Sequence, residues 1–102
     1  MAKVIRERDI ERYLVQQAKA LGGEVRKVKW IGRRGAPDRL VMLPPQNARQ
    51  AFEGAEATIW IELKAPGVAP EAYQLREHAR MRKKGQRVEV VDSFARVDEV
   101  LS

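Results

Sequence analysis

The chain has 102 residues, enough for one domain over residues 1–102, and 20 Lys and Arg against 14 Asp and Glu give it a formal net charge of +6. This basic charge favours a polyanionic partner, nucleic acid before an acidic membrane, and the absence of Cys excludes disulfides, zinc ribbons and thiol nucleophiles. One His, no Gly-rich phosphate loop and no long apolar run exclude a His-rich metal cage, nucleotide-driven chemistry and a membrane span.

The N-terminal half is predicted to contain one helix and two strands. Apolar side chains recur every three or four residues from Ile10 to Leu21, which is typical of an amphipathic helix, and Gly22 ends it. The expected elements are a helix over Arg6–Leu21, a strand over Val25–Ile31 and a strand over Asp38–Leu43. Charged residues near the N-terminus, where a secretory signal needs an apolar stretch, favour an intracellular protein. Residues 48–57 follow no clear pattern, and Phe52 either joins a sheet edge or lies in a mobile loop.

The C-terminal half contains the clearest strand, Thr58–Lys64. Its aliphatic side chains share one face, whereas Trp60, Glu62 and Lys64 share the other. Trp60 either stacks on a base or sugar or packs beneath the first helix, and we expect the packing role. The remaining expected elements are a helix over 71–84, a strand over Arg87–Val91 and a short last helix that Ser93 caps and that runs to Leu101. This order predicts an α/β fold with one mixed sheet.

Two short motifs carry candidate chemistry. Pro37-Asp38 starts the second predicted strand, and Glu62-Leu63-Lys64 lies inside the third. If these strands are neighbours, the Asp38 and Glu62 carboxylates converge, and hard oxygen ligands without His or Cys suit Mg²⁺ or Mn²⁺. The Leu63 carbonyl could face the same ion, and Lys64 could orient or activate a water. Either motif alone is weak, but both together on consecutive strands of a basic chain indicate a site.

In their order along the chain, the motifs resemble those of the PD-(D/E)xK nucleases, and more closely those of the VRR-NUC branch in its stand-alone, phage-type form. The resemblance runs over nearly the whole sequence. It rests on Glu11-Arg12-Tyr13-Leu14, Gly22-Gly23, Gly32–Arg39, Ile61–Gly67, Gln74–His78, Gly85 and Val88–Asp92. It implies a restriction-endonuclease-like α/β fold, in which helices flank a central mixed sheet. The sequence departs from the family pattern at residues 44–57, a segment that is longer than the short turn expected of a minimal member.

The resemblance also implies an activity. Members are metal-dependent DNA nucleases, some related to Holliday-junction resolvases, and their small forms tend to be homodimers. We therefore expect a Mg²⁺- or Mn²⁺-dependent deoxyribonuclease in the cytoplasm of a bacterial or phage-infected host cell. It would act on duplex or branched DNA and leave a 5′-phosphate and a 3′-hydroxyl. Because so short a chain has few loops for reading bases, DNA shape and backbone charge would guide recognition. The alternative is a basic DNA-binding module that retains the fold and does no chemistry.

Site residues follow from the resemblance residue by residue. The implied metal ligands are Asp38, Glu62, the Leu63 carbonyl and Glu11, and the implied catalytic residues are Lys64, Glu62, Asp38, Gln74 and Glu11. Glu7, one helical turn before Glu11, is the alternative if that register is wrong. Without the family pattern, Glu11 would be a surface ion-pair partner and Gln74 a solvated helix residue.

Basic residues near the motifs are candidate DNA contacts. The nucleic-acid-binding candidates are Lys29, Arg33, Arg34 and Arg39. The three arginines surround Asp38, and cations beside a metal site are suited to binding phosphate. The basic run from Arg80 to Lys84 closes a predicted helix, where cations are favoured in any case, so we expect no special role for it. His78 is expected to be structural rather than catalytic.

Overall fold

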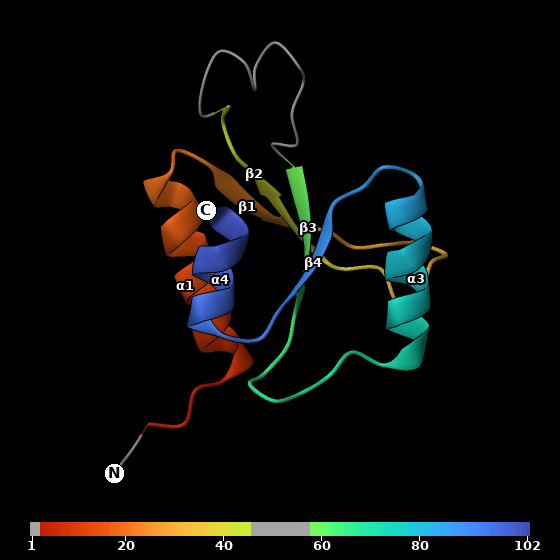
Figure 1. Cartoon of the computed structure of the whole chain (residues 1–102), viewed down its shortest axis with the longest axis horizontal. Helices are drawn as coiled ribbons and strands as arrows, with labels where there is room; N and C mark the ends of the chain where they lie inside the picture. The colour runs from red at the N-terminus through yellow and green to blue at the C-terminus, as the bar shows by residue number, and fades with distance from the viewer. Residues whose placement is uncertain (1–2, 46–57) are drawn as a thin grey trace.

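The computed structural model describes residues 3–45 and 58–102 (Figure 1). The described helices are α1 (Glu7–Ala20), α3 (Ala72–Lys83) and α4 (Phe94–Leu101), and the described strands are β1 (Glu24–Lys27), β2 (Arg39–Met42), β3 (Thr58–Leu63) and β4 (Val88–Val91). Their order is the one predicted from the sequence. The interpretation of residues 48–57, Phe52 included, lies outside the described residues.

The four described strands form one mixed sheet in the order β1-β2-β3-β4. β1 pairs with β2 and β2 with β3 in antiparallel fashion, whereas β3 and β4 run parallel. A parallel pair cannot be joined by a tight hairpin, and α3 lies in the crossover between β3 and β4. The expected α/β architecture, a mixed sheet flanked by helices, is therefore confirmed.

One face of the sheet carries the hydrophobic core. Helices α1 and α4 lie side by side over this face, and α3 covers the other (Figure 1). The core side chains come from both helices and from the faces of β2, β3 and β4 that these helices cover, and they are Ile10, Leu14, Ala18, Val41, Ile59, Ile61, Leu63, Val91, Val97, Val100 and Leu101. Between the helices, the Tyr13 hydroxyl donates to Asp98 at 2.6 Å. The predicted amphipathic helix and alternating strand thus meet across their apolar faces.

The polar face of β3 is turned toward α3. Trp60 and Glu62 alternate with the core residues of the strand, and Glu62 contacts His78 of α3. The expectation that Trp60 packs beneath the first helix is wrong, because α1 covers the opposite face of the sheet. Trp60 lies against Trp30 instead, with ring centroids 5.2 Å apart.

The first strand is shorter than predicted and ends at Lys27 rather than at Ile31. One more backbone bond, from the Val28 N–H to the Asp38 carbonyl, follows this end, and the Trp30 indole N–H then donates to the Pro37 carbonyl at 2.9 Å, so a side chain holds the next part of the chain. Gly32, with a φ of +72°, adopts the left-handed conformation that turns the chain toward β2.

Both C-terminal helices begin close to their predicted positions. Ser93 caps α4 as expected, because its Oγ accepts a hydrogen bond from the backbone N–H of Arg96 at 3.0 Å. Helix α3 begins at Ala72, one residue after its N-cap Glu71. Among the described residues, no helix has both the length and the apolar character needed to cross a bilayer.

Ile61→Ala is expected to lower the free energy of unfolding by about 2–5 kcal/mol, because it leaves a cavity between the sheet and the two helices. Ile61 is 0% exposed, whereas Ile31 is 91% exposed, so Ile31→Ala is the matched control and should change stability by less than about 0.5 kcal/mol. Urea unfolding followed by circular dichroism measures both variants. Equal losses would contradict this position of the core.

Candidate active site

The register of β2 and β3 brings the two predicted motifs together. Arg39 lies opposite Ile61 in this antiparallel pair, so Asp38, one residue before Arg39, lies opposite Glu62, one residue after Ile61. On its other side Asp38 continues the pairing of β1 with β2, because the Val28 N–H donates to the Asp38 carbonyl at 2.9 Å. Side chains alternate along a strand, and both carboxylates therefore point to the α3 side of the sheet. The neighbouring strands on which the predicted site depends are thus present.

Glu62 is a buried acid with an altered proton affinity. It is only 8% exposed. Burial raises its pKa to about 7, the positive charge of Lys64 opposes this shift, and the negative charges of Asp38 and Glu7 add to it. Lys64, Asp38 and Glu7 are therefore among the charged groups that lie near this carboxylate. A carboxyl that is buried beside like charges is suited to binding a cation, which would replace the proton.

His78 closes the site from the α3 side, a contact that the sequence reasoning missed. Its Nε2 lies 3.2 Å from Oε1 of Glu62, and the ring is fully buried. Burial, followed by the charges of Arg82 and Lys64, lowers the pKa of His78 below its usual value. A neutral ring that carries its proton on Nε2 donates to the ionised Glu62 and orients it, while Nδ1 has no partner within the described part of the chain. The only available signal was its place one turn after Gln74.

Lys64 directly follows β3 beside Glu62. Its backbone N–H donates to the Val91 carbonyl at 3.0 Å, which extends the pairing with β4 and fixes the position of the residue. No ion pair joins its ammonium group to any residue in 3–45 or 58–102. The Leu63 side chain belongs to the core, and the role of its carbonyl as a ligand stays a prediction. Lys64 therefore supplies a positive charge that no described carboxylate neutralises by direct contact.

A chain of charges connects α1 with Asp38. Glu11 Oε2 lies 2.7 Å from Nη2 of Arg39, and Nη1 of Arg39 lies 2.9 Å from Oδ1 of Asp38. The Arg39 side chain is only 11% exposed. In this arrangement Glu11 holds the arginine that holds Asp38. The expected contact of Arg39 with phosphate stays a prediction.

The expected three-acid cluster is not assembled in the part of the chain that the structure describes, where no three Asp, Glu, His or Cys side chains gather closely enough to hold a metal ion. Glu11 is bound to Arg39, and Glu7, the alternative on α1, is the helix glutamate whose charge acts on Glu62. Asp38 and Glu62 remain as a pair. Mg²⁺ commonly uses one or two carboxylates and completes its shell with water and substrate phosphate, so a pair is compatible with such an ion.

The loop that leads to Asp38 is fastened to α3. Arg33 Nε donates to both oxygens of Glu77, at 3.0 and 2.7 Å, and the Arg34 guanidinium lies 3.9 Å from the centre of the Tyr73 ring. Both arginines were predicted to bind nucleic acid, and both are already engaged by α3. Their role in the described structure is to position the loop, and their contact with DNA stays a prediction.

Gln74 lies at the start of α3. Its Oε1 accepts a hydrogen bond from the backbone N–H of Glu71 at 2.8 Å, which satisfies one of the free donors at the helix N-terminus. Its expected catalytic role is not tested by this contact and stays a prediction. The backbone of Gln74 also adjoins Gly35, so the helix end and the loop are packed together.

A basic hollow adjoins Asp38. It has a volume of about 600 Å³ and is lined by Lys27, Val28, Lys29, Trp30, Arg33, Ala36 and Asp38. Two of the predicted nucleic-acid contacts, Lys29 and Arg33, thus share a surface with a candidate metal ligand. Lys27 and Trp30 belong to the same surface but were not singled out from the sequence, because the strand pattern does not show which of its faces borders the site.

Two known proteins are similar to this chain over nearly its whole length. No protein-family model matches it. Over 91 residues it is 46% identical to "Putative nuclease p44" of Acyrthosiphon pisum secondary endosymbiont phage 1, a match that covers 89% of this chain and 87% of that protein. A solved structure described as "VRR_NUC domain" superposes with a TM-score of 0.74 at 39% identity and covers 93% of this chain and 92% of that one.

Gly35→Ala is expected to destabilise the loop before Asp38 more than Gly67→Ala destabilises its own turn. Both glycines have positive φ, +89° and +80°, which costs about 1 kcal/mol or more for Ala. A Cβ on Gly35 would also lie 3.0 Å from the Tyr73 carbonyl oxygen, whereas a Cβ on Gly67 would meet nothing within 4 Å. Urea unfolding of both variants measures the difference. Similar losses would contradict the close packing of loop and helix.

Stability should depend on pH through Glu62. Folding raises the pKa of this carboxyl from 4.5 to about 7, so the folded state binds the proton more tightly and loses stability as pH rises through this window. The loss is up to about 3 kcal/mol, measured by urea unfolding in EDTA. The lowered pKa of His78 acts in the opposite direction, because its contribution is lost as pH falls.

A comparison of the native protein with Glu62→Gln separates the pH dependence of stability that comes from the Glu62 carboxyl from the part that comes from His78. The stability of this variant relative to the native protein should increase between pH 4.5 and 7, because an amide does not ionise. Glu99→Gln, which removes an exposed surface carboxylate, is the control and should follow the native pH profile. A constant difference between Glu62→Gln and the native protein across this window would contradict the raised pKa.

Proposed function

Because the chain belongs to the VRR-NUC family of nucleases, we propose that it is a DNA endonuclease that hydrolyses phosphodiester bonds with Mg²⁺ or Mn²⁺ at Asp38 and Glu62. The observation that carries this proposal is the pairing of Asp38 opposite Glu62 on adjacent strands, with Lys64 next along β3. Two carboxylates, and one ammonium group that has no direct ion-pair partner among residues 3–45 and 58–102, thus lie at the same end of these two strands.

The donor set fits a hard divalent cation. Asp38 and Glu62 offer carboxylate oxygens, and the chain has no Cys thiolate that would favour a soft metal ion. The raised pKa of Glu62 reflects burial and negative neighbours, both of which a bound cation would offset. When bound, the ion would polarise the scissile phosphate and stabilise the charge that develops on it. Oε1 of Glu62 is oriented by His78, and Asp38 is oriented by Arg39.

Lys64 has the second part of the chemistry. In this proposal its ammonium group holds the attacking water by a hydrogen bond and stabilises the negative charge that develops on the oxygens of the scissile phosphate. The water oxygen forms a bond to phosphorus in line with the bond to O3′, which breaks. The attacking water releases one proton to bulk solvent, the leaving O3′ takes up one proton from it, and the products are a 5′-phosphate and a 3′-hydroxyl.

The basic hollow beside Asp38 is the proposed path of the DNA backbone. Lys27, Lys29 and Arg33 line it and would neutralise phosphates on either side of the scissile bond. Such contacts position the strand without reading bases, which suits recognition by shape. A branched substrate such as a four-way junction and a two-fold homodimer, which would present two sites to it, complete the proposal.

Lys64→Ala is expected to reduce cleavage by about 100-fold or more while binding to DNA remains within about twofold. Lys19→Ala, which removes a lysine at the end of α1, is the control and should cleave normally. The assay incubates linear, supercoiled and four-way-junction DNA with the protein in Mg²⁺, in Mn²⁺ or in EDTA. Binding is measured separately in EDTA by fluorescence anisotropy.

The outcomes separate the candidate functions. Cleavage that persists in EDTA, or that is unchanged in Lys64→Ala, contradicts the proposed mechanism. Binding that weakens with salt but is never followed by cleavage, with either ion, supports the alternative of a DNA-binding module without chemistry. Cleavage of the junction alone favours a branched substrate. Sedimentation velocity tests the homodimer.

A further inference from the structure

A second hollow lies beside the candidate active site, on the α3 side of the sheet. Its volume is about 390 Å³, within the usual range for sites that bind small molecules or parts of them. The lining residues that matter here come from three elements that are separate in sequence, and they are Trp30, Trp60, Arg33, Arg80, Lys84 and Glu77.

Two fixed aromatic rings form the apolar part of this hollow. Trp30 and Trp60 lie with their ring centroids 5.2 Å apart and their planes inclined by 47°. Each indole N–H is already bonded, that of Trp30 to the Pro37 carbonyl at 2.9 Å and that of Trp60 to Gln86 Oε1 at 3.0 Å. Trp30 is 36% exposed. The rings are therefore held in place and offer faces for stacking rather than hydrogen-bond donors.

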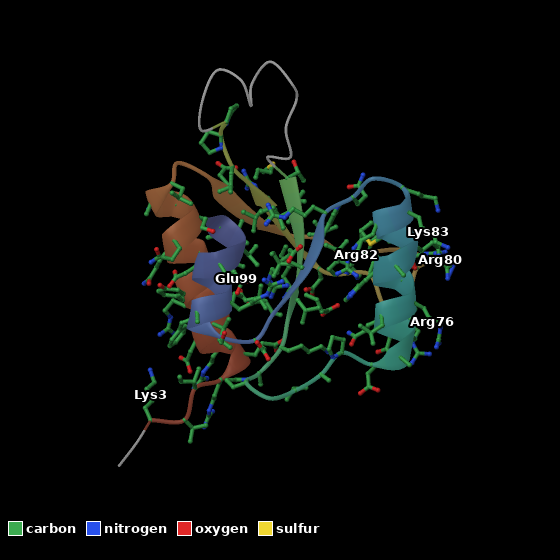
Figure 2. All side chains as sticks on the ribbon, viewed as in Figure 1. Lys3, Arg76, Arg80, Arg82, Lys83 and Glu99 are labelled. Carbon is green, nitrogen blue, oxygen red and sulfur yellow. The ribbon has the colours of Figure 1, made fainter. Side chains whose placement is uncertain are left out.

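The rim of the hollow is positively charged. Among the described residues that line it, three are cations, Arg33, Arg80 and Lys84, and one is a carboxylate, Glu77. The pKa of Glu77 is lowered, first by its hydrogen bond from Arg33 and further by the charges of Arg80 and Lys84, so all three cations lie near this carboxylate. Figure 2 shows Arg80 on the solvent side of α3, between Arg76 and Lys83. Fixed aromatic faces beside an excess of cations match a nucleotide, which has a flat base and an anionic phosphate.

This hollow adjoins the one beside Asp38, because Trp30 and Arg33 line both. The two neighbouring hollows together extend from the candidate metal ligand, past the paired tryptophans, to Lys84 at the end of α3. A strand whose scissile phosphate lies at Asp38 would reach the tryptophans with its neighbouring nucleotides.

We propose that the tryptophan hollow binds an unpaired nucleotide of the DNA strand that is being cleaved. The base stacks on Trp30 and Trp60, and the adjoining phosphates face Arg80 and Lys84. A base within a duplex has no free face, so this site selects DNA in which nucleotides next to the cut are unpaired. The inference rests on the proposed function in taking DNA as the ligand and Asp38 as the place of the cut, whereas stacking of the base on the tryptophans does not depend on cleavage.

Intrinsic fluorescence tests the site directly, because Trp30 and Trp60 are the two tryptophans of the chain. All titrations are made in EDTA, so that no cleavage occurs. A single-stranded oligonucleotide is expected to quench the emission, and an abasic oligonucleotide of equal length and charge is expected to quench it far less. Equal quenching by both would overturn the stacking site. Quenching by the mononucleotide dAMP that the oligonucleotide cannot displace would also overturn it, because the two ligands would then bind at different places.

Two variants give an independent measurement by fluorescence anisotropy with a dye-labelled strand. Trp30→Ala should weaken binding of single-stranded DNA by about tenfold and leave binding of blunt duplex within twofold. Since Trp30→Ala also removes the bond to Pro37, Lys84→Ala provides a second variant that leaves the loop intact. It should weaken single-strand binding by about threefold, whereas the adjacent Lys83→Ala, which does not line the hollow, should not.

Equal weakening of single-strand and duplex binding in Trp30→Ala, or equal effects of Lys83→Ala and Lys84→Ala, would overturn the proposal. Failure of the proposed nuclease activity gives a different result. In that case no DNA is cleaved with either ion, but the base-dependent quenching in EDTA is retained.

Discussion

The register between β2 and β3 is the constraint on which the arrangement of the site depends. Because Arg39 lies opposite Ile61, Asp38 lies opposite Glu62, and the pleat turns both carboxylates toward α3. A shift by one residue would turn Glu62 toward α1 and expose Ile61 on the other face. The aliphatic side of β3 is buried against α1 and α4, so the same shift would dismantle the core. Core packing therefore holds the two acidic groups in position.

The electrostatics of Glu62 connect this geometry with chemistry. A carboxylate that is buried next to Asp38 and Glu7 has no fully compensating positive charge in the protein alone, although Lys64 offsets part of the repulsion. The raised pKa expresses this imbalance. Such groups are costly for stability and are concentrated at functional sites, where a ligand supplies the missing charge. The contact with His78 keeps the carboxylate oriented.

Helix α3 supports the site from two sides. Through His78 it contacts Glu62 on β3, and through Tyr73 and Glu77 it holds the loop that ends at Asp38. The two halves of the proposed metal site thus rest on one element. Arg33 serves both purposes, because it is bonded to Glu77 and also lines the two adjoining hollows. Arg33 can therefore position the loop and also contribute positive charge to the surface proposed to bind DNA.

The sequence by itself determined the order of the elements, the two faces of the third strand, the acidic and basic residues of the two motifs and the family. These properties depend on the local spacing of apolar and polar residues, which repeats every two residues in strands and every 3.6 residues in helices. Only the tertiary structure decided that His78 meets Glu62, that Trp60 packs on Trp30 rather than beneath α1, and that Arg39 engages Glu11. Each of these contacts joins residues distant in the chain, and local periodicity does not show which helix covers which face of the sheet.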